Sequence, residues 1–308
     1  MKNIKKIGGV VLSILLLLTF SSVNADEQEI YINNRGIEMS ETHVQNLTSM
    51  GYSEQEISNM TQSEFDENKD LHGDLVSQTT KYYRVETIIP NNPYSMMSNV
   101  DNPYPSFTYE ITEEEYENSG SISLEPSMIS INASATVETT YKKMTTSIIN
   151  YNNQYRYKNV VIWKKLPFWK TNDIIGIGFD EKVYGVSSSK RINSYYIYGT
   201  SCDSNATTSG TWSLSSTGYS VEFNFPHKSQ SSDDEKLYVE MYFNVAKNTT
   251  LNINVLNAYG NYRHLKGPSM YISPSFSISA FGISVGASYE SHYDSMSTAQ
   301  ATLTGINW

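Results

Sequence analysis

The chain of 308 residues contains one cysteine, Cys202, and few charges, which make up 18% of its residues. A single cysteine excludes an internal disulfide framework and a zinc site built from several cysteines. Acidic residues outnumber basic ones by 32 to 22. This balance argues against a general nucleic-acid binder, because contacts to phosphates need a basic surface. The 24 Tyr and 10 Phe residues also argue against a disordered chain.

Familiar catalytic motifs are missing as well. The sequence has no G-x-S-x-G, no H-E-x-x-H, no phosphate-binding loop and no G-x-G-x-x-G. Among the predicted strands, His292 and Asp294 form a local pairing of histidine and carboxylate, and His264 could meet them across a sheet. Cys202 could act as a nucleophile, but no histidine is near it in sequence. We therefore predict a non-enzymatic protein with no cofactor and no metal site.

A long apolar run is found at the N-terminus alone. Val10 to Phe20 is almost entirely apolar, follows three lysines, and precedes the small residues Val23 and Ala25. These features predict a signal peptide over residues 1–25, and hence a secreted, extracellular protein. A membrane anchor is the alternative, but the run is about half of the ~20 residues that a spanning helix needs.

Charge is distributed unevenly along the remaining chain. Residues 26–125 carry 20 acidic and 4 basic side chains, whereas residues 126–308 carry 12 and 15. This shift indicates a boundary, and the acidic segment could dock on the more basic one within the same molecule. We predict four parts: a signal peptide (1–25), an acidic segment with short helices (26–80), a Pro/Asn-rich connection with a possible first strand (81–131), and an antiparallel β domain (132–308).

Helix signals are confined to residues 38–71. Ser40 is suited to begin one helix and Gly51 to end it, while Ser53–Glu56 and Thr61–Glu64 have the capping-box pattern. Three short helices are expected here.

From about Val137 the hydrophobic period becomes two. The clearest example is Leu237 to Val245, in which apolar residues alternate with Tyr238, Glu240, Tyr242 and Asn244. Such alternation predicts antiparallel strands with one face buried and the other in water, and therefore places Glu240 at the surface. The fold class predicted is α+β, mostly β, with a small N-terminal helical segment followed by an antiparallel β-sandwich-like domain.

Two segments are candidates for function. Between Tyr141 and Lys170, cationic and aromatic residues alternate, a composition that can bind anionic polymers or sugars. We expect a cell-wall polymer or carbohydrate as the ligand; strands with cationic outer faces would give the same pattern. The expected contact residues are Trp163, Lys164, Lys165 and Trp169.

The second candidate segment, residues 271–289, lies within a stretch without charge between Lys266 and Glu290. It alternates small polar and apolar residues around Gly282, as a membrane-inserting β-hairpin would. A pore-forming protein is thus the alternative function, and of the two predicted functions it is the one that has a membrane as its partner. An ordinary sandwich hairpin would also fit. The inserting residues would be Phe276, Ile278, Ile283 and Val285.

Several short motifs together resemble a family of secreted, functionally uncharacterised proteins of Gram-positive bacteria. The resemblance implies export and the order of helices before strands, and it brings no catalytic residues. The segments that carry it are Met50–Tyr52, Met60–Phe65, Leu75–Tyr83, Trp163–Pro167, Asp173–Phe179 and Tyr293–Met296.

Overall fold

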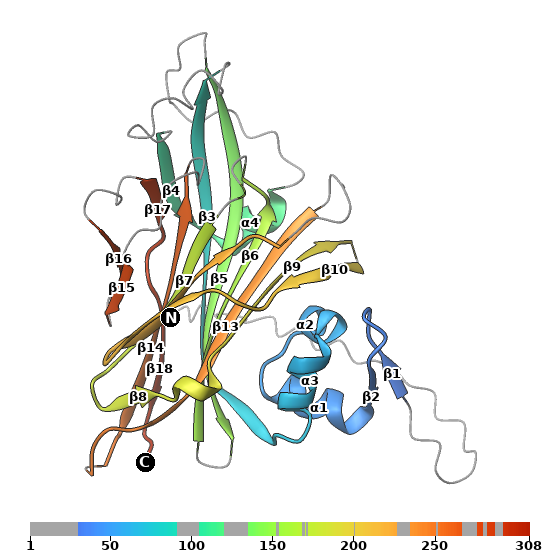
Figure 1. Cartoon of the computed structure of the whole chain (residues 1–308), viewed down its shortest axis with the longest axis vertical. Coiled ribbons are helices and arrows are strands. Elements are labelled where there is room, and N and C mark those ends of the chain that lie inside the picture. The colour runs from blue at the N-terminus through green and yellow to red at the C-terminus, as the bar shows by residue number, and fades with distance from the viewer. Residues whose placement is uncertain are drawn as a thin grey trace, which may run out of the picture.

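The computed structural model describes residues 30–90, 105–119, 135–151, 154–167, 170, 172–199, 201–226, 235–250, 252–266, 276–279, 282–286 and 292–308. The predicted signal peptide and part of the predicted connection lie outside these residues. Two antiparallel sheets pack face to face, and a group of short helices covers part of the outer face of one of them (Figure 1). The predicted fold class is confirmed.

The larger sheet contains the longest strands of the described chain. Its order is β10 (Ser201–Thr207), β9 (Arg191–Tyr198), β13 (Glu235–Lys247), β6 (Gln154–Lys165), β5 (Ala135–Tyr151), β3 (Gly73–Pro90) and β4 (Ser106–Ile111), and β8 (Val183–Gly185) also pairs with β13. A short 3-10 turn (Ser187–Ser189) follows β8. We call this the large sheet.

The second sheet, called the small sheet, has the order β11 (Thr211–Ser215), β12 (Gly218–Asn224), β7 (Asn172–Phe179), β14 (Val255–Leu265) and β17 (Tyr293–Ser295), and β18 (Ala299–Thr304) also pairs with β14. Two strand pairs stand apart: β1 (Ile30–Ile32) with β2 (Glu38–Ser40), and β15 (Phe276–Ser279) with β16 (Gly282–Val285). The β15–β16 hairpin falls in the segment considered above for membrane insertion.

The three predicted helices are present, and each begins where the sequence indicates. They are α1 (Glu41–Ser49), α2 (Glu54–Asn59) and α3 (Gln62–Asn68), and their N-caps are Ser40, Ser53 and Thr61. In all three, the cap side chain accepts a hydrogen bond from the backbone N–H of the third helical residue, and the side chain of that residue accepts one from the backbone N–H of the cap. With β1 and β2 they form the helical segment (residues 30–71).

The core between the sheets is apolar and aromatic. The faces of β6 and β13 that contain Trp163, Val161, Leu237 and Phe243 are fully buried against β7 and β14. At one point the sheets come especially close. A Cβ atom on Gly260 of β14 would collide with the hydroxyl of Thr146 on β5, so only glycine fits there.

Replacing Gly260 with alanine is expected to lower the free energy of unfolding by about 1–3 kcal/mol, the usual cost of overpacking a core. Urea unfolding followed by tryptophan fluorescence measures the loss. In a Thr146→Ala background the same replacement should cost less, because the colliding oxygen is gone. Equal costs in both backgrounds would contradict this close approach.

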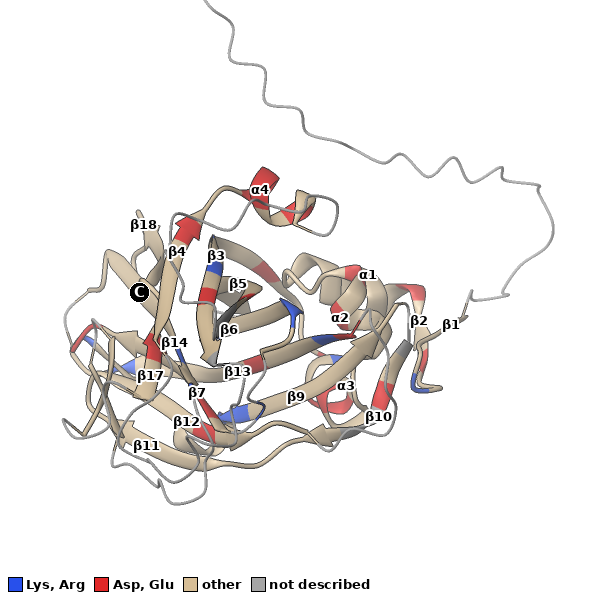
Figure 2. Cartoon of the chain, turned by 90° about the horizontal axis from the view of Figure 1, so that it is seen from above, with Lys and Arg blue, Asp and Glu red and all other residues tan. Residues whose placement is uncertain are grey.

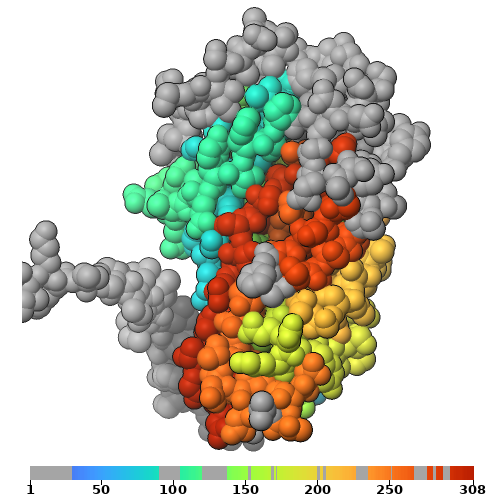
Figure 3. Space-filling model, turned by 90° about the vertical axis from the view of Figure 1, so that its left-hand side faces the viewer, coloured from blue at the N-terminus to red at the C-terminus, as the bar shows by residue number. Residues whose placement is uncertain are grey.

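Segments far apart in sequence join along one edge of the sandwich. Ser77 and Thr79 of β3 donate hydrogen bonds to the backbone oxygens of Thr302 and Gln300, at 2.8 and 2.7 Å. Figure 3 shows the orange and red residues of the C-terminal strands beside the teal residues of the β3–β4 region. Strand β3, which precedes the predicted β domain in the sequence, is therefore an integral part of the sandwich.

This position of β3 changes the predicted boundaries. The strand begins at Gly73, inside the segment expected to be helical, and continues through the start of the predicted connection. The connection also holds β4 and a further short helix, α4 (Glu113–Asn118). Within the described part of the chain, no helix has the length and apolar character needed to cross a membrane.

Candidate binding groove

Three adjacent strands of the large sheet present a regular grid of side chains on its outer face. Pairing places Thr80 of β3 opposite Thr145 of β5, which lies opposite Val160 of β6. Because side chains alternate along a strand, every second residue shares this face. The grid, called the platform, consists of Gln78, Thr80 and Tyr82 on β3, Lys143, Thr145 and Ser147 on β5, and Lys158, Val160 and Ile162 on β6.

Two helical elements form the ends of a groove above the platform. The α1–α2 turn and α2 contribute Gly51, Ser53 and Glu56 at one end, and α4 contributes Glu113 at the other. Tyr82 donates a hydrogen bond to Glu113 at 2.6 Å, which fixes α4 to the platform. In Figure 2, α4 lies above these strands and the helices α1–α3 lie to their right. The groove encloses about 310 Å³.

The lining of the groove is mostly polar and uncharged. The hydroxyls of Thr80 and Thr145 are 3.0 Å apart and hydrogen bonded, so each retains capacity for a ligand. Val160 and Ile162 add a small apolar area. Within the described residues, Lys143 forms no hydrogen bond or ion pair, although its side chain is partly buried. The groove thus offers hydroxyls, an amide, a phenol and one cation without a partner.

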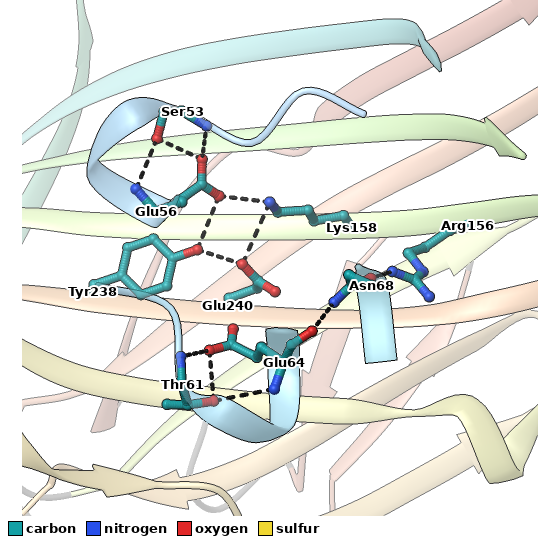
Figure 4. A network of polar contacts seen from close by, with 9 residues as sticks. All are labelled: Ser53, Glu56, Thr61, Glu64, Asn68, Arg156, Lys158, Tyr238 and Glu240. Atoms are coloured by element: carbon teal, nitrogen blue, oxygen red, sulfur yellow. Dashed lines mark hydrogen bonds and ion pairs between the residues drawn. The ribbon is translucent and has the colours of Figure 1, made fainter. Parts of the chain in front are cut away.

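A network of buried charges holds the α2 end of the groove in place (Figure 4). The ammonium group of Lys158 lies 2.6 Å from Glu56 Oε1 and 3.4 Å from Glu240 Oε2. The hydroxyl of Tyr238 lies within hydrogen-bonding distance of both carboxylates, and its oxygen is 2.9 Å from Glu56 Oε1. Lys158 and Glu240 are almost fully buried, and Glu56 is 11% exposed. One cation therefore serves two carboxylates where α2 meets β6 and β13.

Further contacts hold α3 against the same face. Arg156 of β6 donates a hydrogen bond to Asn68. Glu67 accepts hydrogen bonds from Arg191 at 2.6 Å and from Tyr242 at 2.8 Å. The acidic helical segment therefore docks on cations of the β domain, as the charge distribution along the sequence predicts.

Burial raises the pKa of Glu240 to about 7. Lys158 acts to lower this pKa but offsets only part of the effect of burial, and the nearby carboxylates of Glu64 and Glu56 raise the pKa further. Glu56 behaves differently. Burial acts to raise its pKa, but Lys158 and hydrogen bonds from Ser53 bring it below the ordinary value. One oxygen of Glu240 is buried without a hydrogen bond among the described residues, which disfavours its ionised form.

The predicted exposure of Glu240 is wrong. The alternation along β13 predicts one buried face and one face in water, yet Tyr238, Glu240 and Tyr242 are 1–2% exposed. They do face away from the core between the sheets, but the helical segment covers them. Periodicity identifies the two faces of a strand without telling what packs on the second one.

The expected contact residues do not gather around the groove. Trp163 is fully buried and donates to Tyr262 at 2.9 Å, so it is not a surface contact residue as predicted. Lys164 donates to the backbone oxygens of Tyr116 and Glu117, both at 2.7 Å, and thereby caps the C-terminal end of α4. Lys165 is exposed, and Trp169 lies outside the described residues.

The residues expected to insert into a membrane lie on the β15–β16 hairpin. Ile278, Ile283 and Val285 are buried against Ile174, Leu265 and Tyr293, and Phe276 is partly buried beside them. Gly176 and Gly218 of the small sheet leave the space that Ile278 occupies, which agrees with the close packing that glycines in a strand indicate. In this state the apolar side of the hairpin faces the protein.

Residues of the platform were not predicted as a site. Gln78, Thr80 and Tyr82 occupy every second position of one strand, and Lys143 and Thr145 do so on another. A polar alternation of this kind is the one signal in the sequence that could have indicated them, and it is also typical of any solvated strand face.

Cys202 is half-buried, and burial raises the pKa of its thiol, which makes it a weak nucleophile.

No protein-family model matches the chain. No curated protein matches it either. Among solved structures, it is similar to the pilus backbone protein RrgB of Streptococcus pneumoniae, with 10% identity and a TM-score of 0.28 over 50% of this chain and 40% of that one. It is also similar to the N-terminal domain of the Streptococcus gordonii adhesin Sgo0707, with 9% identity and a TM-score of 0.28 over 75% and 56% of the two chains.

A third such structure is the collagen-binding domain of the Erysipelothrix rhusiopathiae surface protein RspB, with 5% identity, a TM-score of 0.25, and coverage of 55% of this chain and 66% of that one. The chain spans less than half of the RrgB structure. These TM-scores are too low to carry a conclusion about function.

Proposed function

We propose that this chain is a secreted, non-enzymatic binding protein whose groove takes a short glycan segment of an extracellular polymer, such as that of a Gram-positive cell wall. One observation carries the proposal: a polar platform on the outer face of the large sheet remains open between two helical walls. The amino-acid types of the platform suit a sugar, which presents many hydroxyls and small apolar faces.

The dimensions of the platform support an oligosaccharide. Side chains two residues apart on a strand are about 7 Å apart, and neighbouring strands are about 4.8 Å apart, so the platform measures about 14 by 10 Å. Its residues lie on strands of the sheet, so little conformational freedom of the backbone is lost on binding. Lys143 would additionally attract a carboxylate or phosphate carried by a wall polymer.

A Thr145→Trp replacement tests the proposal, because it fills the middle of the groove from an outward-facing position. We expect adsorption to purified Gram-positive cell walls to fall at least tenfold while the melting temperature stays close to that of the wild type. Lys165→Ala, an exposed lysine outside the groove, is the control and should adsorb normally. Normal adsorption of the Trp variant would contradict binding in the groove.

Lys143→Gln separates two kinds of ligand. If the ligand is anionic, this change should weaken adsorption at low salt and have little effect at high salt, where the attraction is screened. If the ligand is neutral, the variant should behave as the wild type at both salt concentrations. Loss of adsorption in Lys165→Glu, with the groove variants unaffected, would instead support the predicted site near Lys164 and Lys165.

Membrane insertion remains the second candidate function, and the structure of the β15–β16 hairpin favours it. The hairpin forms a two-stranded sheet of its own, separate from the sheet on which it packs. It contacts that sheet through the apolar side chains that would enter the lipid. Dye release from anionic liposomes tests this function. Leakage that Ile283→Asp abolishes in a folded protein would support it, and absence of leakage by the wild type would contradict it.

A further inference from the structure

A second polar cluster lies deep between the two sheets, away from the groove. On the small sheet, Asp173 of β7, His264 of β14 and Asp294 of β17 stand side by side in one row. On the large sheet, Lys142 of β5 lies opposite Trp163 of β6. All of these side chains are buried. The sequence suggested that His264 could meet the His292–Asp294 segment, and the strand register confirms that contact.

Lys142 and Asp294 bridge the two sheets. The ammonium nitrogen is 2.8 Å from Asp294 Oδ2, and the two side chains are 0% and 1% exposed. The nitrogen lies over the Trp163 ring at 4.1 Å and near the Tyr262 ring at 5.6 Å, so aromatic rings line its surroundings. An ion pair without access to water is costly to maintain, because both charges have lost their hydration.

The other oxygen of Asp294 is held by a backbone donor. The N–H group of His264 donates to Asp294 Oδ1 at 3.0 Å. His264 itself is fixed by Asp173, whose Oδ1 lies 2.8 Å from His264 Nδ1. A donor held in this position would stabilise negative charge that develops on Oδ1 if the carboxyl carbon were attacked.

We propose that Lys142 and Asp294 condense with each other to form an intramolecular amide between β5 and β17. A proton passes from the ammonium group to Oδ2, which leaves a neutral amine beside a neutral carboxylic acid. The amine nitrogen attacks Cγ, a second proton moves from nitrogen to Oδ2, and the bond between Cγ and Oδ2 breaks. One water molecule leaves, the amide keeps one hydrogen on nitrogen, and no oxidant or cofactor is consumed.

Burial and positioning favour this condensation. Amine and acid are held in contact, which replaces an encounter in solution by a reaction within one site. The product replaces two buried charges by a neutral amide. The pair Lys158–Glu56 is a useful contrast, because it is also close, at 2.6 Å, but Glu56 is partly exposed and its carboxylate is occupied by hydrogen bonds from Ser53. We expect no amide there.

The cross-link would join residues 152 positions apart in the sequence. It would connect the two sheets covalently, a role that the single cysteine cannot fill through a disulfide. The proposal is independent of the groove and of its ligand, because none of the platform residues takes part.

Intact mass spectrometry of the folded chain tests the proposal directly. The wild type should be lighter than its sequence by one water molecule, whereas Lys142→Arg, which keeps the positive charge but is not a nucleophile, should have its full mass. Tryptic digestion of the wild type should give a branched peptide in which Lys142 is not cleaved and is joined to the C-terminal peptide, residues 267–308.

Asp294→Ala should likewise have its full mass, and the wild type should melt at a higher temperature than Lys142→Arg. A folded wild-type protein with its full sequence mass and normal cleavage after Lys142 would overturn the proposal. Loss of water that maps to any other pair of residues would overturn it as well.

Discussion

Replacing Lys158 with methionine is expected to lower the free energy of unfolding by about 3–5 kcal/mol, the range for removing one partner from a buried ion pair. Lys158 is the cation closest to both Glu56 and Glu240, and methionine fills a similar volume without charge. The change leaves the buried carboxylate of Glu240 and the mostly buried carboxylate of Glu56 without their cation. Chemical unfolding at pH 7.5, followed by circular dichroism, measures the loss.

Two controls separate charge from packing. Lys165→Met removes an exposed lysine from the same strand and should change stability by less than about 0.5 kcal/mol, as surface substitutions usually do. The triple variant Lys158→Met, Glu56→Gln, Glu240→Gln should recover a large part of the loss, because no carboxylate remains to be neutralised. A Lys158→Met protein as stable as the wild type would contradict the role given to this network.

The stability of the wild type should fall as the pH rises from about 4.5 to 7, and Glu240→Gln should remove most of this dependence. Glu240 has a pKa of about 7 in the folded protein against an ordinary value of 4.5. The folded form therefore binds more protons than the unfolded form within this window, and stability decreases with pH. The contribution of this group is about 3 kcal/mol, fully present below pH 4.5 and lost above pH 7.

Neighbouring groups do not reverse this sign. Burial also raises the pKa of Glu64. The pKa of Glu56 is lowered, so its effect belongs to the range below its ordinary value of 4.5. Unfolding measured at pH 5, 6, 7 and 8 tests the prediction, with Glu54→Gln, an exposed residue of α2, as the control. If Glu240→Gln and the wild type show the same dependence on pH, the burial of an ionisable Glu240 is contradicted.

Local features of the fold could be predicted because they depend on neighbouring residues. The helix starts at Ser53 and Thr61 are determined by hydrogen bonds within four residues, and they are found as predicted. The buried faces of β6 and β13 follow from an alternation that is equally local. The docking of the helical segment could be inferred from net charge alone, although not the face of the sheet on which it docks.

The groove and the buried cluster depend on strand register, which the sequence does not specify. Between β5 and β6, Tyr141 pairs with Lys165 and the next residue, Lys142, pairs with Trp163. From Lys142 onward the two strands pair in unbroken register, which places Lys142 on the core face with Trp163 and Lys143 on the groove face with Ile162. A shift of one residue would exchange these two faces. The adjacent lysines Lys142 and Lys143 therefore have opposite environments, although their sequence context is nearly the same.

Calorimetric titration of the folded chain with glycan fragments released from Gram-positive cell walls is the most direct test of binding in the groove. We expect saturable binding with one fragment per chain, weakened at least tenfold by Thr145→Trp and unchanged by Lys165→Ala. Absence of binding by the wild type, or equal affinity of the wild type and the Thr145→Trp protein, would contradict the function proposed for the groove.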